Sequence, residues 1–415
     1  MSGLDVVTFG CRLNGYESDV VRARATDAGL TDAVVFNTCA VTGEAVRQAH
    51  QAIRKARRER PGARLIVTGC AAQIDPHSFA DMAEVDLVLG NAEKTQTSAY
   101  AVTPPTARIN VADIFSVHES AAPAVTDRNG RARAYVEIQN GCDHRCTFCI
   151  IPYGRGNSRS VGAGAVVEAV RRLAAEGCAE VVLTGVDLTS WGADLPGAPS
   201  LGHLVRRILR LVPDLPRLRL SSIDAAEIDA ELLACLAEES RLCPHLHLSL
   251  QAGDDMILKR MKRRHSRAQS LALIAKVRAV RPETAFGADL IAGFPTETDD
   301  MFQNTLALIE EARLAYLHVF PFSPRPGTPA ARMPAVERAT VKARAERLRG
   351  AGAAGLNRHL DARVGRTVQG LVERAGQARA EDFTEIAFDG EAVAGQIVPI
   401  TVTAHDGARA IGALA

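Results

Sequence analysis

Three short apolar runs near the N-terminus are each followed at once by a cysteine, in Phe9-Gly10-Cys11, Asn37-Thr38-Cys39 and Thr68-Gly69-Cys70. The runs alternate with stretches of helical spacing, which predicts an α/β unit with a parallel sheet. In such a sheet the residues just past the strands share one carboxyl edge, where ligands bind. We therefore expect the three cysteines to converge on one site. The alternative is three core cysteines that happen to follow strands.

The elements of this first segment can be placed from the pattern. The expected strands are Val6–Phe9, Ala33–Asn37, Leu65–Thr68 and Val85–Leu89, and the expected helices are Ser18–Ala28 and Glu44–Arg58. Glycines stand immediately before Cys11 and Cys70, and they allow tight turns and close backbone approach to a bulky ligand. The residues from about Thr97 to Arg133 contain turn-forming proline and glycine and are expected to be a connector.

A longer alternation of strands and helices follows the connector. The expected strands are Ala134–Gln139, Glu180–Thr184, Arg217–Leu220, His245–Leu250, Ala285–Ile291 and Tyr316–Phe320. Six strands with helical crossovers predict a curved, partly open relative of the eight-fold barrel, whose chemistry belongs at the carboxyl ends of the strands. Asp289 lies within one of these apolar strands. Burying a lone carboxylate is costly, so we expect it either to pair with a basic residue or to be functional.

Three more cysteines, Cys142, Cys146 and Cys149, follow the first of these strands within eight residues. They are too close together for a disulfide framework, but thiolates at this spacing can ligate one iron–sulfur cluster. Three cysteines on a four-iron cluster leave one iron open to bind another molecule. The alternative is a structural zinc site with His144 or a distant cysteine as its fourth ligand. The remaining cysteines, Cys178, Cys235 and Cys243, are expected to be structural.

The C-terminal part changes character. Ala335–Leu360 predicts a long basic helix or helix pair, and short alternating runs broken by glycines follow from about residue 363. These runs predict a small β-barrel. We expect three domains, covering residues 1–105, 128–360 and 361–415.

Composition sets broad limits. The chain has 415 residues, 47% of them hydrophobic, a net charge of +1 and nine cysteines. Without a secretory signal, this cysteine content indicates a reducing compartment, so we expect a cytoplasmic protein. No apolar run approaches the roughly 20 residues of a membrane span. Basic residues crowd around residues 54–60, 259–265 and 338–349, where each group is either a solvated helix face or part of a phosphate-binding surface.

Taken together, these motifs resemble the methylthiotransferases of the radical S-adenosylmethionine (SAM) class. The resemblance covers essentially the whole chain. It is strongest in Thr8–Asn14, Asn37–Thr42, Thr68–Cys70, Gly141–Gly156 and Phe320–Pro334. Within the class, Asn37–Thr42, Leu183–Gly192 and His318–Ala330 look most like the branch acting on threonylcarbamoyladenosine in tRNA, beside the anticodon. The C-terminal module resembles the TRAM domain, an RNA-binding barrel.

The resemblance implies two [4Fe-4S] clusters and SAM as cofactors. Cys142, Cys146 and Cys149 would hold the cluster that cleaves SAM, and Cys11, Cys39 and Cys70 an auxiliary cluster that carries or donates sulfur. The residues expected to contact SAM are Phe148, Thr184, Gly185, Asp187, Ser222, Gln251 and Asp289. No catalytic side chain is expected beyond the two clusters. The expected partners are the anticodon stem-loop of tRNA and an electron donor protein, and the chain is expected to be a monomer.

The implied reaction uses one SAM to methylate sulfur and a second to generate a radical that abstracts hydrogen from carbon 2 of the modified adenine. Radical chemistry from a cofactor is needed because no ordinary acid–base side chain activates an aromatic C–H bond. Close alternatives are the branches that modify isopentenyladenosine in tRNA or an aspartate of a ribosomal protein. An alternative of another class is an RNA-binding protein whose clusters are structural or redox-sensing.

Overall fold

The computed structural model describes residues 3–101, 107–120, 123 and 130–415. The chain divides into two compact units. The first contains Met1–Asp127, Gln139–Val161 and Ser323–Ala331, and the second contains Arg128–Ile138, Gly162–Phe322 and Arg332–Ala415. Both groups of three cysteines therefore belong to the first unit. The three expected domains stay a prediction, because this division does not test whether each segment folds by itself.

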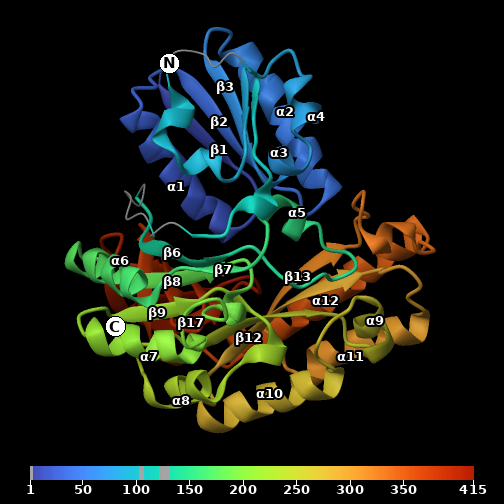
Figure 1. The fold of residues 1–415 in the computed structure, drawn as a ribbon. Helices are drawn as coiled ribbons and strands as arrows, with labels where there is room; N and C mark the ends of the chain where they lie inside the picture. Colours follow the sequence, from blue (N-terminus) through green and yellow to red (C-terminus); the bar gives the residue numbers. More distant parts are fainter. Residues whose placement is uncertain (1–2, 102–106, 121–122, 124–129) are drawn as a thin grey trace. The chain divides into compact units, whose positions relative to one another are not determined.

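The first unit is built on a five-stranded parallel sheet whose strands lie in chain order. The strands are β1 (Leu4–Thr8), β2 (Ala33–Thr38), β3 (Arg64–Gly69), β4 (Leu87–Leu89) and β5 (Ile109–Asn110). The helices are α1 (Arg12–Asp27), α2 (Gly43–Glu59), α3 (Cys70–Ile74), α4 (Pro76–Ala80) and α5 (Ile151–Arg155), with 3-10 turns at Glu93–Thr95, Thr97–Tyr100 and Ile114–Ser116. Figure 1 shows α1 on one side of β1–β3 and α2, α3 and α4 on the other.

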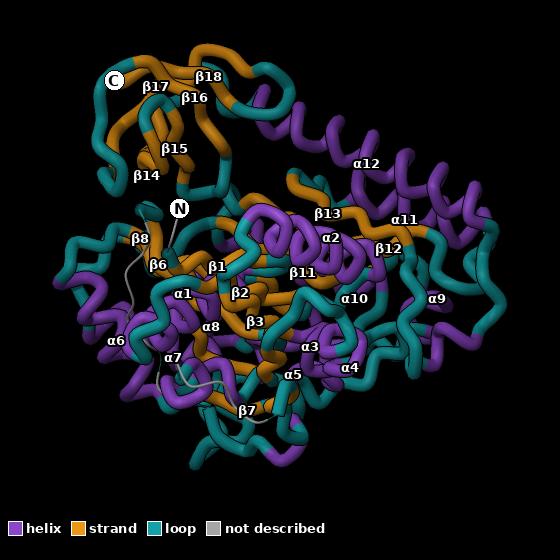
Figure 2. Tube along the Cα trace, turned by 90° about the horizontal axis from the view of Figure 1, so that it is seen from above, coloured by secondary structure: helices purple, strands orange, loops and turns teal. Residues whose placement is uncertain are grey.

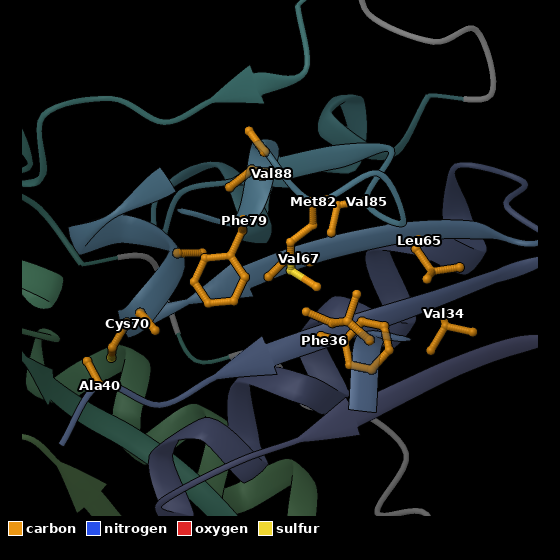
Figure 3. Packing of buried hydrophobic residues seen from close by; sticks show 14 of the residues in the cluster. Val34, Phe36, Ala40, Leu65, Val67, Cys70, Phe79, Met82, Val85 and Val88 are labelled. Atoms are coloured by element: carbon orange, nitrogen blue, oxygen red, sulfur yellow. The ribbon is translucent and has the colours of Figure 1, made fainter. Parts of the chain in front are cut away.

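Alternating side chains of the buried strands form a core on each face of this sheet. On one face, Val34 and Phe36 of β2 pack with Leu65 and Val67 of β3 and with Phe79 of α4 (Figure 3). On the other face, Val35 and Ile66 pack with residues of α1 such as Val21. Because both faces are covered, β2 and β3 read as continuous apolar runs. The predicted parallel α/β fold is confirmed.

One strand of this sheet was not predicted. β5 lies inside the segment expected to be a connector, and it pairs in parallel with β4 through Ile109 and Asn110. A strand of two residues carries no alternation that a sequence pattern could reveal.

The second unit contains the strands of the predicted central barrel. These are β6 (Arg133–Asn140, whose last two residues belong to the first unit), β8 (Glu180–Gly185), β9 (Arg217–Leu220), β10 (Ser222–Ile223), β11 (His245–Gln251), β12 (Ala285–Ala292) and β13 (Tyr316–Pro321). β6, β8 and β9 are neighbours in one sheet, and β10–β13 form a second, parallel sheet. β9 runs almost directly into β10, and a further parallel bridge joins Leu218 to Leu242. All six expected strands are present. In the first unit, β7 (Arg159–Ser160) pairs with the end of β6.

Helices connect these strands, as expected for a β/α barrel. They are α6 (Ala163–Ala175), α7 (Leu201–Leu211), α8 (Ala230–Glu238), α9 (Asp255–Arg260), α10 (Arg267–Val280), α11 (Asp299–Glu311) and α12 (Arg338–Asp361), with 3-10 turns at Leu188–Ser190, Ala225–Glu227 and Pro329–Arg332. Several start at side-chain caps: Ser200 caps α7, Thr298 caps α11, and Ser266 with Gln269 forms a capping box on α10. Such caps satisfy N–H groups that have no partner within the helix. In the described residues, no helix is both long enough and apolar enough to cross a membrane.

The predicted C-terminal β-barrel is confirmed. Its strands are β14 (Thr367–Arg374), β15 (Gln377–Ala380), β16 (Glu385–Asp389), β17 (Ile397–His405) and β18 (Ala410–Leu414), and they close in the order β14-β15-β16-β18-β17. Figure 2 shows them gathered into one module that follows α12. The interior is filled by apolar residues such as Val372, Ile386 and Ile400.

This module is fixed to the amino ends of the central strands by buried charges. Glu180, at the start of β8, and Arg219, in β9, are both fully buried and form a two-pronged ion pair with N–O distances of 2.8 and 3.1 Å. Arg219 also donates to the carbonyl of Glu381, at 2.9 Å, and Arg217 donates to that of Gln369, at 2.7 Å. The C-terminal barrel therefore completes the base of the central one.

Candidate iron–sulfur and SAM site

The three N-terminal cysteines lie where the sequence predicts, at the carboxyl edge of neighbouring strands. Cys11 stands directly before α1, Cys39 directly after β2, and Cys70 is the first residue of α3, directly after β3. The register aligns the strand ends, with Thr8 opposite Asn37 and Thr38 opposite Gly69. Figure 3 shows Cys70 and Ala40 at the same end of the core, where β2 and β3 finish.

Glycines permit this close approach. Gly10 has a φ of 92°, and a Cβ there would lie 2.7 Å from both the Cβ and the Sγ of Cys39. Gly69 has a φ of 95°, and a Cβ there would lie 2.4 Å from the backbone nitrogen and oxygen of Thr38. An L side chain is therefore excluded at both positions by conformation and by space.

The chemistry of these thiols fits an iron–sulfur cluster. Cys39 and Cys70 are buried, Cys11 is exposed, and all three are free thiols. Burial raises the pKa of Cys39 to about 11, and the neighbouring Cys70 and Cys11 add to the rise. Three soft donors therefore lie at one strand edge, and each would be stabilised as a thiolate by binding iron.

A buried charged group lies next to these cysteines, and sequence reasoning missed it. Arg155 of α5 donates to both carboxylate oxygens of Glu17, at 2.7 and 2.8 Å, and to the side-chain oxygen of Asn14, at 2.6 Å. Lys94 lies 2.8 Å from the same carboxylate and donates to Asn91 at 2.6 Å. Burial alone would raise the pKa of Glu17, but Arg155 and Lys94 lower it to about 2. The sequence signal was weak, because Glu17, Lys94 and Arg155 are far apart along the chain.

The second group of cysteines lies in a loop held in place by backbone hydrogen bonds. The nitrogen of Cys142 donates to the carbonyl of Gly156, at 3.1 Å, and that of Cys149 to Cys146, at 3.0 Å. The nitrogen of Ala330 donates to the carbonyl of Thr147, at 2.9 Å. All three cysteines are partly exposed, as an open iron site requires. Phe148, expected to contact SAM, lies half-buried in this loop.

The helix that follows this loop touches the first cysteine group. A Cβ on Gly154 of α5 would lie 3.2 Å from the Cβ of Cys70, so only glycine fits without displacing it. The side chain of Asn91 donates to the carbonyl of Gly154 and lies 3.9 Å from the Sγ of Cys70. Both groups of cysteines are therefore part of one packed structure.

The other residues expected to contact SAM lie at or near the carboxyl ends of the strands in the second unit. Thr184 and Gly185 end β8, and Gln251 ends β11 with a φ of 67°. Asp187 is buried just after β8, and Ser222 is exposed in β10. Their contact with SAM stays a prediction.

Asp289 lies in the middle of β12 rather than at its end. Its Oδ1 is 2.9 Å from Nε2 of His247 on β11 and 3.1 Å from Nδ1 of His318 on β13. Burial would raise the pKa of Asp289, but the two histidines hold it well below its usual range. The expected pairing with basic residues is therefore observed, and its role toward SAM stays a prediction.

Some residues of the basic clusters that the sequence predicts form ion pairs within the protein. Arg263 and His265 face Asp224, and Arg344 is buried between Glu297 and Asp299. Arg54, Lys55 and Arg58 of α2 remain exposed, as do Arg338, Lys342 and Arg349 of α12. Cys178, Cys235 and Cys243 are buried, which agrees with their expected structural role.

The fold and the cysteine loop define a radical SAM enzyme. Residues 136–309 match the radical SAM superfamily, and residues 4–90 match the uncharacterized protein family UPF0004. Among solved structures, the radical SAM methyltransferase TsrM from Kitasatospora setae has a similar fold, with a TM-score of 0.57 and 15% identity over 80% of this chain and 77% of that one. The superfamily match implies a [4Fe-4S] cluster and SAM, and ligation of that cluster by Cys142, Cys146 and Cys149 stays a prediction.

Relatives that match nearly the whole chain identify its family within the radical SAM class. A threonylcarbamoyladenosine tRNA methylthiotransferase from Rickettsia prowazekii is 52% identical, covering 95% of this chain and 93% of that protein. One from Aquifex aeolicus is 32% identical over 95% and 98% of the two chains. A tRNA-2-methylthio-N6-dimethylallyladenosine synthase from Parafrankia is 35% identical over 97% and 84%. This chain belongs to the family of threonylcarbamoyladenosine tRNA methylthiotransferases.

Proposed function

We propose that this chain adds a methylthio group to carbon 2 of N6-threonylcarbamoyladenosine in tRNA, next to the anticodon, by radical SAM chemistry. The observation that carries the proposal is the joining of two three-cysteine groups within one compact unit, through the packing of Gly154 on Cys70. A reaction that breaks an unreactive C–H bond and forms a C–S bond requires both a radical source and a sulfur source.

Each cysteine group has its own role in this proposal. Cys142, Cys146 and Cys149 hold the [4Fe-4S] cluster that binds SAM, and Cys11, Cys39 and Cys70 hold an auxiliary [4Fe-4S] cluster. When bound, the clusters and SAM supply the radical that removes hydrogen and the methylthio group that replaces it. The protein contributes position: the hydrogen bonds of Cys142, Cys149 and Thr147 fix the first loop, and the aligned ends of β1–β3 fix the second site.

The SAM contacts are assigned to Phe148 in the cysteine loop and to Thr184, Gly185, Asp187, Ser222, Gln251 and Asp289 in the central barrel. Hydroxyl, carboxylate and amide groups of this kind can bind the amino, carboxylate and ribose groups of SAM. The two histidines on Asp289 fix the orientation of its carboxylate. These residues bind and orient, and no side chain is assigned a proton transfer.

The tRNA is proposed to meet the protein through exposed cations. The face of α2 with Arg54, Lys55 and Arg58 suits phosphate groups. The C-terminal module suits them less well, because residues 361–415 contain eight Asp and Glu against five Arg. Arg363, Arg379 and Arg409 of this module are paired with its own carboxylates. We assign the module mainly to closing the base of the barrel. We also propose a monomer in the cytoplasm, served by an electron donor protein.

Mass spectrometry of tRNA nucleosides from cells with and without the gene tests the reaction. We expect selective loss of the methylthio derivative of threonylcarbamoyladenosine, with accumulation of its unthiolated parent. Loss of the methylthio derivative of isopentenyladenosine would instead assign the second candidate, which is favoured by the Parafrankia relative at 35% identity. An unchanged set of nucleosides would overturn both and point to the ribosomal-protein branch or to a non-enzymatic role.

A further inference from the structure

A fixed positive charge lies beside the N-terminal cysteine group. Arg155 is 2% exposed, and its guanidinium is held at both nitrogens by the carboxylate of Glu17. Lys94 is fully buried and contacts the same carboxylate. Two cations share one anion, so the buried group carries a net positive charge. An uncompensated buried charge is costly, which implies that a nearby anion completes the balance.

The cysteines are the groups that this charge faces. A thiolate at Cys70 or Cys11 would act on Arg155, and together with Glu17 these groups hold its pKa well above the usual value despite its burial. Asn14 ties Arg155 to the cysteines on one side, because its Oδ1 lies 3.9 Å from the Sγ of Cys11. Asn91 ties Lys94 to them on the other, through its contact with the Sγ of Cys70.

We propose that Arg155, held by Glu17, is the counter-ion of the cluster ligated by Cys11, Cys39 and Cys70, and that it raises the reduction potential of that cluster. The proposal rests on the proposed function, which places a cluster on these cysteines. The charge of a cluster, and the hydrogen bonds to its sulfurs, set its potential. A cation at a buried position favours the more negative, reduced state more strongly than a cation in water does.

The position of Arg155 also links the two cysteine groups. Arg155 ends α5, six residues after Cys149, so the charge beside the N-terminal group is supplied by the segment that carries the other group. Arg325 offers a comparison within the site. A thiolate at Cys39 would act on Arg325 as well, but Arg325 is only partly buried, and solvent screens its effect. Arg155 is a positioning and charge-balancing residue, and it is not assigned a contact with substrate.

The test uses the full chain with Cys142, Cys146 and Cys149 replaced by alanine, reconstituted with iron and sulfide, so that only the N-terminal group can bind a cluster. Iron content and a redox titration followed by electron paramagnetic resonance are measured in this background. With R155M added, we expect a midpoint shifted to a more negative potential. R155K is expected to restore part of the shift, and R325M to give a smaller one. R24M, at an exposed cation of α1 paired with Asp27, is expected to leave the midpoint unchanged.

The outcomes separate the two claims. If the background protein binds no iron, the proposed auxiliary cluster fails. If it binds a cluster whose midpoint is the same with and without R155M, the counter-ion role is overturned, even if R155M lowers thermal stability or iron content. Should R155M lose all iron, E17Q provides the second measurement. E17Q leaves Arg155 in place but removes its anion, so we expect a shift to a more positive potential, and an unchanged or more negative midpoint would overturn the proposal.

Discussion

The ring of Phe383 stacks on the ring of His245, with centroids 4.7 Å apart and planes 22° apart. His245 begins β11 of the central barrel, and Phe383 lies in the turn between β15 and β16 of the C-terminal module, with a φ of 75°. The guanidinium carbon of Arg219 lies 5.2 Å from the centre of the same ring. A non-glycine residue holds such a φ only when its surroundings enforce it, so this contact fixes the module to the base of the barrel.

Replacing Phe383 by alanine is therefore expected to destabilise the central barrel as well as the module. We expect a loss of about 2–3 kcal/mol in the free energy of unfolding, below the range for a fully buried phenylalanine because this ring is only partly buried. Urea unfolding followed by the fluorescence of Trp191, the single tryptophan and a buried residue of the second unit, measures this. F383L is the control and should keep most of the stability. If F383A destabilised only the C-terminal module and left the unfolding monitored by Trp191 unchanged, Phe383 would not stabilise the central barrel.

Deleting residues 361–415 should unfold the second unit rather than only weaken tRNA binding. The deletion exposes the pair of Glu180 and Arg219 and removes the carbonyl groups of Ala380 and Glu381 that Arg219 uses. Far-ultraviolet circular dichroism and Trp191 fluorescence of the truncated chain measure the loss of structure. A folded truncated chain with native fluorescence would show that the module is an independent attachment.

The second unit is expected to lose stability at low pH because Glu180 becomes protonated. Burial alone would raise its pKa, but Arg219, Arg133 and Arg217 lower the pKa from 4.5 to about 2. The stabilisation of about 3 kcal/mol is present above about pH 4.5 and is lost as the pH falls toward 2, because the unfolded chain binds the proton more tightly. In E180Q this pH dependence of the unfolding midpoint should disappear, while E231Q, at a partly exposed residue of α8, serves as the control. If the unfolding midpoint of E180Q fell at low pH as it does in the wild type, Glu180 would not be the source of the pH dependence.

Replacing Arg54, Lys55 and Arg58 together by alanine should weaken tRNA binding and reduce its dependence on salt. Each cation that no longer neutralises a phosphate lowers the slope of log affinity against log salt by roughly 0.7–0.9, so the slope should fall by about 2. Filter binding at several salt concentrations gives the slope. R366A, at an exposed arginine of the C-terminal module, is the matched control. If R366A weakened tRNA binding more than the triple variant did, the C-terminal module rather than α2 would be the main tRNA-binding surface.

The two cysteine groups should fail in different ways. C146A is expected to abolish reductive cleavage of SAM, because the cluster that binds SAM loses a ligand. C39A is expected to keep SAM cleavage and lose thiolation of tRNA. Liquid chromatography of deoxyadenosine and of nucleosides measures both, with C243S, at a buried cysteine of the second unit, as the control for a general effect of thiol loss. Thiolated product from C39A would remove the auxiliary site from the mechanism.

The sequence was sufficient to predict most of the fold and both cysteine groups, because these features are local. A strand, a glycine and a cysteine in succession give the position of Cys11 or Cys70 without any knowledge of tertiary contacts. The six barrel strands can likewise be recognised in the sequence as apolar runs of several residues. β5 was missed because its two residues carry no period.

The charged networks could not be predicted in the same way. Arg155 and Glu17 are 138 residues apart, and Arg219 and Glu381 are 162 apart. The sequence around each of these charged residues looks like that around an ordinary solvated charge. Only the folded chain buries these groups away from water. The basic segment around residue 263 illustrates the converse, because it reads as a surface patch but Arg263 and His265 turn inward to Asp224.

The closing of the barrel base by residues 361–415, which follow the barrel strands in the sequence, has a consequence for biosynthesis. Glu180 and Arg219 leave the ribosome long before Glu381 and Phe383, which cover them. Domains generally fold in the order of synthesis, but this barrel cannot finish folding until Glu381 and Phe383 have left the ribosome. A chain shortened by a premature stop codon would expose an ion pair meant for the interior, and cellular proteases would degrade it before it could compete with intact enzyme for tRNA.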